Sequence, residues 1–271
     1  MKPLNYKYII QADTSQSDTV NVIGLDGLPL AITKNFNPYA HNTQFGLVYE
    51  VPIKQKNDLK AGDKVFFHHL VTDPKNKVIH NGEDFYFADW DTIYAKIIDD
   101  KLIPLQDIFF AERIPNNELE RNGIILQEYA ENIHQIVKVI STNELVREQG
   151  INDGDIIVTV ENAGVPIKDS NLVWLKLINV FGVVRNNELI PIKDKAIIME
   201  SITNEETNIR FGMIVSNFIG RKFLKGVLMH DFDDLHKGTI VSFIHGAFTR
   251  LVWNDNKYAV VGREDLIMIN K

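Results

Sequence analysis

Histidine and carboxylate side chains are the groups in this sequence that could bind a metal ion or transfer a proton, and they gather in two places. His68 and His69 are adjacent. Neighbouring side chains on a strand point to opposite faces, so we expect the two rings not to share an ion. The second group, three aspartates and two histidines within residues 230–236, stands just before a glycine turn and is expected to be a solvated loop. Neither group predicts a catalytic or metal site.

Other signatures of chemistry are missing from the sequence. It contains no Gly-x-Gly-x-x-Gly, phosphate-loop or His-Glu-x-x-His pattern, so no nucleotide and no catalytic zinc is expected. There is no cysteine, which excludes a disulfide scaffold, a thiolate metal site and a cysteine nucleophile. Trp90, Trp174 and Trp253 lie in or just after expected hairpins, which favours packing over ligand stacking. We therefore expect no enzyme and no cofactor.

Composition and charge limit the kinds of molecule that the chain is expected to bind. The 271 residues carry 36 acidic and 29 basic side chains, a formal charge of -7 that repels a phosphate backbone, so nucleic acid is not expected. The longest apolar stretch, residues 172–184, includes Lys176 and Asn179 and falls short of the roughly 18 residues of a membrane helix. The first residues lack the apolar run of a secretory signal. We expect a soluble, cytoplasmic chain with protein partners.

The sequence contains an internal repeat, clearest at a polar turn followed by apolar residues. Residues 99–107 read Asp-Asp-Lys-Leu-Ile-Pro-Leu-Gln-Asp, and residues 186–194 read Asn-Asn-Glu-Leu-Ile-Pro-Ile-Lys-Asp. Leu102 and Leu189 in these copies are 87 residues apart. A strand-like run follows each copy, and a similar run, residues 6–10, opens the chain. The sequence therefore predicts three equivalent first strands.

Three further landmarks follow in the same order in each copy. Gly62, Gly154 and Gly238 stand in polar turns before β-branched and aromatic runs, where glycine adopts positive φ at little cost. A hairpin comes next, signalled most strongly by the Asn-Gly pair at 81–82. The hairpins are expected at 78–87, 167–175 and 251–261. A closing strand is expected after each hairpin, at 92–98, 180–184 and 265–269.

Four landmarks in one order predict an all-β protein of three tandem units, with boundaries at 1–98, 99–185 and 186–271. No helix pattern competes with this assignment. Residues 116–134 are rich in helix formers, but their apolar spacing is irregular and Gly123 interrupts them.

The order of the landmarks resembles the GroES or chaperonin-10 co-chaperonin family. Residues 60–65 (Lys-Ala-Gly-Asp-Lys-Val) and 81–86 (Asn-Gly-Glu-Asp-Phe-Tyr) resemble the middle of the family pattern, and residues 263–269 (Arg-Glu-Asp-Leu-Ile-Met-Ile) resemble its closing strand. The resemblance spans nearly the whole chain. It implies three small GroES-like β-barrels, a homo-oligomer and a GroEL-like chaperonin as partner.

Members of that family dock on their chaperonin through an apolar tripeptide in a long loop after the first strand. The resemblance assigns this role to one triplet in each unit: Leu30-Ala31-Ile32, Ile124-Ile125-Leu126 and Met213-Ile214-Val215. A few aliphatic side chains, at about 1.5–3 kcal/mol each, can anchor a weak contact that multivalency strengthens. The alternative is that the triplets are buried strands, because the nearby segments 20–25 and 218–224 are apolar enough to demand burial.

Two functions remain open at this point. In the first, the chain is a divergent co-chaperonin, with a phage genome as one source, whose tripeptides dock on a chaperonin ring. Three fused units do not divide evenly into a seven-fold ring, which counts against simple capping. In the second, it is a virion structural protein, a ring, capsid or tail component, whose barrels are assembly modules. The localisation would then be the virion.

Overall fold

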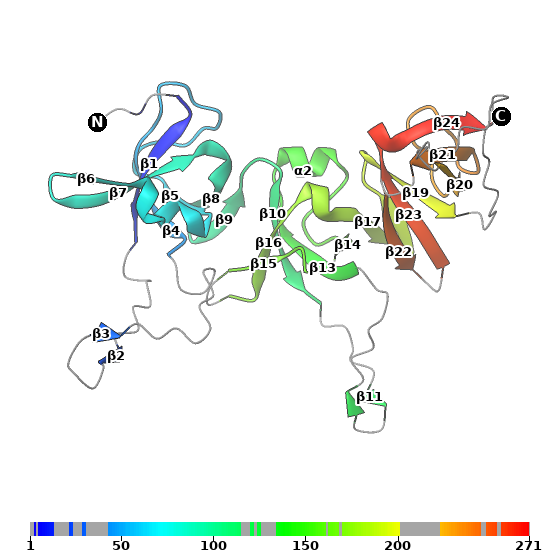
Figure 1. Ribbon diagram of the computed structural model, residues 1–271, viewed down its shortest axis with the longest axis horizontal. Coiled ribbons are helices and arrows are strands. Elements are labelled where there is room, and N and C mark those ends of the chain that lie inside the picture. The colour runs from blue at the N-terminus through cyan, green and yellow to red at the C-terminus, as the bar shows by residue number, and fades with distance from the viewer. Residues whose placement is uncertain are drawn as a thin grey trace, which may run out of the picture.

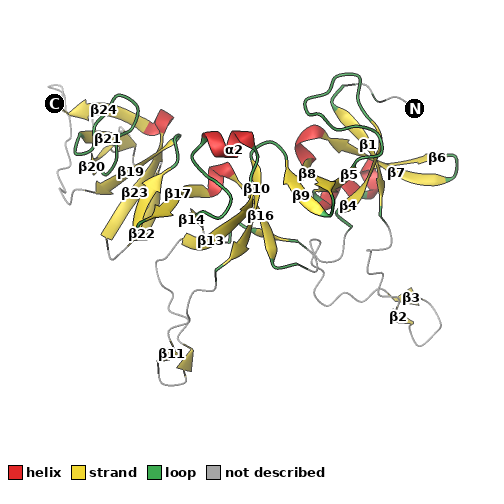
Figure 2. Cartoon of the chain, turned by 180° about the vertical axis from the view of Figure 1, so that it is seen from behind, coloured by secondary structure: helices red, strands yellow, loops and turns green. Residues whose placement is uncertain are grey.

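Three antiparallel sheets follow one another along the chain and lie in a row, as the computed structural model shows (Figure 1). The structure describes residues 3, 5–13, 43–114, 134–160, 162–167, 170–200, 223–244, 248–253 and 256–270, and four two-residue strands at 22–23, 29–30, 120–121 and 124–125. Strands dominate these residues, and the helical turns between them are short (Figure 2). None of the helices in this described part is long and apolar enough to cross a membrane.

The first sheet has seven strands in the order β6-β7-β1-β4-β5-β8-β9. Its strands are β1 (Lys7–Ala12), β4 (Phe45–Glu50), β5 (Lys64–Phe67), β6 (Lys77–His80), β7 (Glu83–Asp89), β8 (Ile93–Ile98) and β9 (Lys101–Pro104). Three 3-10 helices accompany them: η2 (His69–Thr72), η3 (Pro74–Asn76) and η4 (Trp90–Thr92).

The second and third sheets repeat this arrangement. The second has the order β15-β16-β10-β13-β14-β17-β18, and the third has β22-β23-β19-β20-β21-β24. The second sheet contains β10 (Ile108–Arg113), β13 (His134–Ser141), β14 (Ile156–Val160), β15 (Val165–Pro166), β16 (Leu172–Lys176), β17 (Val180–Arg185) and β18 (Glu188–Pro191), with α2 (Glu144–Glu148) and η5 (Leu177–Asn179). The third contains β19 (Lys195–Glu200), β20 (Phe223–Leu228), β21 (Ile240–Ile244), β22 (Phe248–Trp253), β23 (Asn256–Gly262) and β24 (Leu266–Asn270), with η6 (Arg263–Asp265).

The glycine turns occupy the same place in each sheet. Gly62, Gly154 and Gly238 have φ of 89°, 88° and 89°. Each donates its backbone N–H to a carbonyl of the sheet's second strand in chain order, at 2.7, 2.8 and 2.8 Å respectively; the acceptors are Val48, Val139 and Leu228. A residue with a Cβ pays a conformational penalty in this left-handed region, which is why glycine stands there three times.

The all-β prediction is confirmed, and the prediction of small barrels is not. The edge strands of the first sheet, β6 and β9, pair only with β7 and β8, and over the described residues none of the three sheets closes on itself. The boundaries expected at 98/99 and 185/186 both fall inside hairpin turns. Strands β9 and β18 pair with the strands that precede them, so the first two sheets extend to Pro104 and Pro191.

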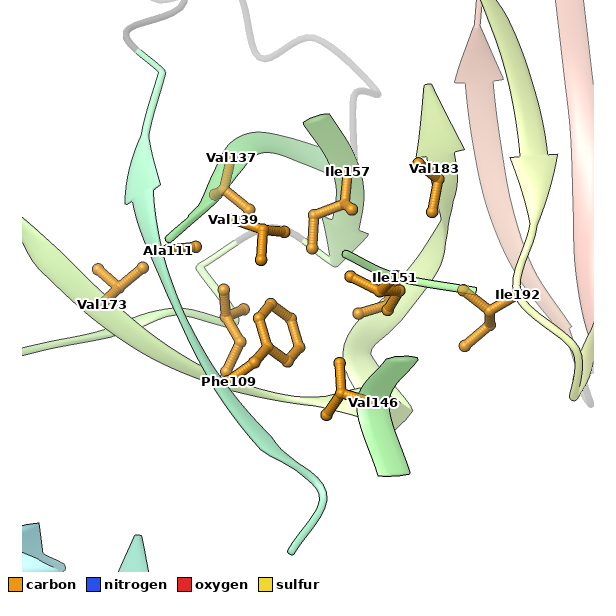
Figure 3. Close-up of a cluster of buried hydrophobic side chains, with 12 residues drawn as sticks. Phe109, Ala111, Val137, Val139, Val146, Ile151, Ile157, Val173, Val183 and Ile192 are labelled. Carbon is orange, nitrogen blue, oxygen red and sulfur yellow. The ribbon is translucent and has the colours of Figure 1, made fainter. Parts of the chain in front are cut away.

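Several strands are apolar on both faces because both faces are covered. In β10, Phe109 and Ala111 belong to the core of the second sheet, which also contains Val146 of α2 (Figure 3). Ile108 and Phe110 point the other way, into a cluster shared with the first sheet. All four β10 side chains are at most 1% exposed. A continuous apolar run, in place of alternation, is typical of a strand buried on two sides.

Two apolar clusters join neighbouring sheets, and we call them the first and second junctions. The first joins Phe66 and Tyr94 of the first sheet to Phe110 and Trp174 of the second. The Phe66 and Phe110 rings meet edge-on with centroids 6.0 Å apart, and Tyr94 lies 4.3 Å from Trp174. The second junction comprises Val158, Phe181, Leu189, Ile197, Leu251 and Val260, with five partly buried side chains around them. These contacts hold the three sheets together.

Polar contacts also fix the turn between the first two sheets. Gln106 stands in this turn with φ of 58°, and its amide donates to the Trp90 carbonyl oxygen at 2.5 Å. From the second sheet, the Asn143 amide donates to the Gln106 carbonyl oxygen at 2.7 Å. The Asn143 side-chain oxygen also accepts from the Val146 N–H at 3.0 Å, which caps α2. The turn is therefore held from both sides.

Gly154→Ala should lower the free energy of unfolding by about 1–2 kcal/mol, because alanine is strained at φ of 88°. An added Cβ would meet no heavy atom within 4 Å, so the cost is conformational and not steric. Urea denaturation followed by circular dichroism measures this difference.

The matched control is Asn187→Gly. Asn187 has φ of 64° in the turn between β17 and β18, so glycine relieves strain there and should leave stability unchanged or slightly raised. Equal stability of the Gly154→Ala variant and the parent would contradict the assignment of the left-handed turn.

Candidate protein-binding surface

His68 and His69 do not lie on a strand, so the expectation that their rings point to opposite faces is wrong. Strand β5 ends at Phe67, and His69 begins η2. The two rings lie 4.1 Å apart between centroids, and His68 also meets the Tyr94 ring edge-on at 5.9 Å. The His68 Nδ1 accepts the Leu70 N–H at 3.1 Å, which caps the 3-10 helix. The pair is thus packed beside the first junction.

Burial lowers the pKa of His68 to about 4, with smaller contributions from His69 and from Lys176 of the second sheet. Burial also lowers the pKa of His69. Both rings are therefore neutral at pH 7. In the described ranges, no three histidine, aspartate or glutamate side chains gather closely enough to hold a metal ion.

The acidic group at residues 231–236 forms a hydrogen-bonded turn. The Asp231 carboxylate accepts the Lys237 N–H at 2.7 Å, and Asp233 pairs with Arg263 of η6. Phe232 and Leu235 form a pair of backbone hydrogen bonds, each 2.9 Å long. These contacts account for Asp231 and Asp233 as turn residues.

Charged side chains also line a cleft between the second and third sheets. Arg185 and Arg263 are on its wall, as is Lys195. Each of these cations has a partner: Arg185 contacts Asp155 at 3.0 Å, Arg263 pairs with Asp233, and Lys195 donates to the Ile178 carbonyl oxygen at 3.3 Å. Three of the four cations on this wall are therefore held by protein groups, and Lys193 is the fourth.

The tryptophans pack against protein groups in the described structure. Trp90 lies beneath the Lys56 ammonium, whose nitrogen is 4.5 Å from a ring centroid. Trp174 is buried in the first junction, and Trp253 packs against the second. Two of the three are thus junction residues.

The expected docking tripeptides are only partly within the described chain. Leu30 lies in β3 (Pro29–Leu30), which pairs with β2 (Val22–Ile23). Ile124 and Ile125 form β12, which pairs with β11 (Glu120–Arg121). The remaining candidates lie outside the described residues; they are Ala31, Ile32, Leu126, Met213, Ile214 and Val215.

The two short strand pairs, which we call the loop hairpins, share a topological position. β2–β3 falls between β1 and β4, and β11–β12 falls between β10 and β13, so each lies between the first and second strands of its sheet. Figures 1 and 2 both draw them below the row of sheets. The two loop hairpins therefore lie on the same side of the row of sheets.

Sequence reasoning missed a second apolar surface, on the outer side of the first sheet. Tyr49 is 40% exposed on β4, and its ring lies 4.4 Å from that of Phe85 on β7. Val78 on β6 and Phe87 on β7 are half-buried. The other two sheets differ at the position of Tyr49: Met229 of the third sheet packs against the second junction, whereas Ile140 of the second sheet is 38% exposed.

No protein-family model matches this sequence, and no curated protein matches it. The functional argument therefore depends on the chain's own residues.

Acidification should destabilise the protein between pH 6.5 and pH 4 through His68. The unfolded chain binds a proton near pH 6.5 and the folded ring only near pH 4, so stability is complete above this window and falls as pH decreases through it. The midpoint of urea denaturation, measured from pH 7 to pH 4, should show a smaller decrease for His68→Gln than for the parent.

His236→Gln is the control for this measurement. Its side chain is 90% exposed, so the change removes a histidine without disturbing a buried ring. A His68→Gln variant with the same pH dependence as the parent and His236→Gln would show that His68 does not couple protonation to folding.

Proposed function

We propose that this chain is a non-enzymatic binding protein of the co-chaperonin type, built from three tandem GroES-like units. The observation that carries the proposal is the repeated position of the loop hairpins. Two apolar candidates, Leu30 in the first unit and Ile124-Ile125 in the second, stand in segments inserted between the same two strands of equivalent sheets. Repetition of position supports repetition of role.

The chemistry of such a contact is aliphatic burial. Each buried isoleucine or leucine contributes about 1.5–3 kcal/mol, which gives a weak contact by itself. The sheets that carry the loop hairpins are packed together at the two junctions. A scaffold that holds several weak contacts at set distances raises their effective concentration, provided that the partner's sites match the spacing. A ring with repeated grooves, such as a GroEL-like chaperonin, is a partner of this kind.

A second candidate function is that of a structural assembly protein, for example a ring, capsid or tail component of a virion. The observation that favours it is the continuous apolar packing from sheet to sheet. In this function the apolar triplets make permanent contacts with neighbouring chains and need no chaperonin. The two functions therefore differ in whether binding depends on a chaperonin and its nucleotide.

Ile125→Ser should abolish nucleotide-dependent binding to a chaperonin. Serine lacks the aliphatic side chain that would anchor the contact. Ile125 pairs with Glu120 in a two-residue strand pair outside the three large sheets, so the sheets should stay folded. The measurement is co-sedimentation of the purified chain with a GroEL-type double ring, with ATP, with ADP and without nucleotide.

The matched control is Leu145→Ser, on the exposed side of α2, where Leu145 is 46% exposed. It replaces an aliphatic side chain by serine as Ile125→Ser does, and it should bind as the parent does. If the parent shows no association with the chaperonin under any nucleotide condition, the co-chaperonin proposal is wrong and the assembly function is favoured.

A further inference from the structure

The cleft between the second and third sheets has a volume of about 350 Å³. Its wall includes Ile192 and Lys193 of the turn that connects the two sheets, and Gln149 at the end of α2. The third sheet contributes the turn before Gly238 and Arg263 of η6. Pockets that bind small molecules have volumes from about 300 Å³ upward, so the cleft has room for a small ligand.

The cleft lies where the third sheet has a shorter segment than the second. At the first junction, Asn143 at the start of α2 donates to the carbonyl oxygen of Gln106 at 2.7 Å and covers the connecting turn. The segment that carries α2, between the second strand and the turn glycine, spans residues 139–154 in the second sheet and only 228–238 in the third. The shorter segment contains no helix, although all of its residues are described. Lys193, which holds the place of Gln106 in the repeated turn, lines the cleft instead.

Cations outnumber carboxylates on the wall of the cleft, although the whole chain has a formal charge of -7. The charged residues of the wall are Arg185, Lys193, Lys195, Arg263, Asp231 and Asp233. The wall therefore has an excess of two positive charges, or of one if Asp155, the partner of Arg185, is included. A phosphate monoester, with a charge of about −1.5 to −2 at pH 7, is an anion that suits such a wall.

The two arginines retain donors for a ligand. Arg185 uses its Nη2 for both of its contacts, with the Gly150 carbonyl oxygen and with the Asp155 carboxylate, each at 3.0 Å. Arg263 also uses Nη2, for Asp233. A guanidinium has five N–H groups, so the Nε and Nη1 donors of each arginine remain without a partner among the described residues. Arginine binds phosphate through two such donors at once.

Lys193 adds an ammonium group that is open on all sides. The side chain is exposed, and over the described part of the chain it makes no hydrogen bond or ion pair. Lys195, in contrast, is half-buried and donates to the Ile178 carbonyl oxygen at 3.3 Å. An ammonium group has three donors, and those of Lys193 are all available to an anion.

Gln149 brings an unsatisfied polar group to the same wall. Its Oε1 is buried and has no hydrogen-bond partner in the described structure. A buried acceptor without a partner is uncommon in folded proteins, and a ligand that donates a hydrogen bond satisfies it. The oxygens of a phosphate dianion only accept hydrogen bonds, so the donor must come from another part of the ligand. A hydroxyl group is such a donor.

We propose that this cleft binds a small phosphorylated sugar or polyol. The phosphate lies among Arg185, Lys193 and Arg263, and a hydroxyl group of the same ligand donates to Gln149 Oε1. The carbon skeleton lies against the apolar part of the wall, which includes Ile192. None of the loop-hairpin residues lines the cleft, so the site is independent of the proposed function.

Isothermal titration calorimetry at constant ionic strength tests the proposal with four probes: glucose 6-phosphate, glycerol 3-phosphate, inorganic phosphate and glucose. At least one of the two phosphate esters should bind at one site per chain. Inorganic phosphate should bind about tenfold more weakly than that ester, the effect of one good hydrogen bond, and glucose more weakly still. Failure of both esters to bind overturns the proposal, and so does an affinity for inorganic phosphate that equals theirs.

Two substitutions separate the two parts of the ligand. Lys193→Glu reverses an exposed charge and should weaken the binding of the esters and of inorganic phosphate by about tenfold or more. Gln149→Leu removes the hydroxyl acceptor, so it should weaken the esters by about tenfold and leave inorganic phosphate unchanged. Since the Gln149 side-chain oxygen has no partner to lose within the described structure, this variant should stay folded.

Lys101→Glu is the matched control for the charge reversal. Lys101 is also exposed and lies on β9, outside the cleft, and Glu188 stands at the equivalent position of the next repeat. This variant should bind every probe as the parent does. Thermal unfolding followed by circular dichroism checks that all variants are folded. Equal affinity of folded Lys193→Glu and Lys101→Glu for the phosphate esters would overturn the assignment of the cleft.

Discussion

Burial of strands on both faces is the constraint on which the rest of this structure depends. β10 places Phe109 and Ala111 in its own sheet's core and Ile108 and Phe110 in the first junction. A strand with this composition would expose large apolar area if either side were open. The first and second sheets are therefore not independent bodies on a flexible linker, because the same strand completes two cores.

The short connections between consecutive sheets follow from the same constraint. β9 and β18 pair with the sheet before them, and only three residues separate each of them from the first strand of the next sheet. A connection this short holds the next sheet close to the previous one, and the Asn143 and Gln106 amides secure the first of these turns. Local turn chemistry and long-range packing thus favour one arrangement, which is typical of sequences that specify a single fold.

The polar side chains singled out in the sequence have structural partners in this scaffold. The polar groups that could have formed a site are used in turns and pairs: the Asp231 carboxylate holds the turn before Gly238, and His68 caps η2. Exposed large apolar side chains are found on more than one sheet, for example Tyr49 on the first and Ile240 on the third. Segments inserted at one topological position can change without disturbing the sheets, since they lie outside the ladder.

Features that depend on neighbouring residues were predictable from the sequence. The turn glycines, the Asn81-Gly82 hairpin and the repeated turns at 99–100 and 186–187 have the conformations that their residue types favour, with positive φ at each of these turns. The order of the strands along the chain in each repeat followed from the same local signals. The docking role given to Ile124 and Ile125 stays a prediction.

Features that depend on contacts between distant residues were decided only by the tertiary structure. The sequence of β10 shows that two faces must be buried, but it does not show that Tyr94 and Phe66 cover one of them. The barrels expected from the family resemblance are not confirmed over the described residues, and the expectation of opposed His68 and His69 rings was wrong. Sheet closure and the end of β5 are set by packing across the fold, which the spacing of residues along the chain does not encode.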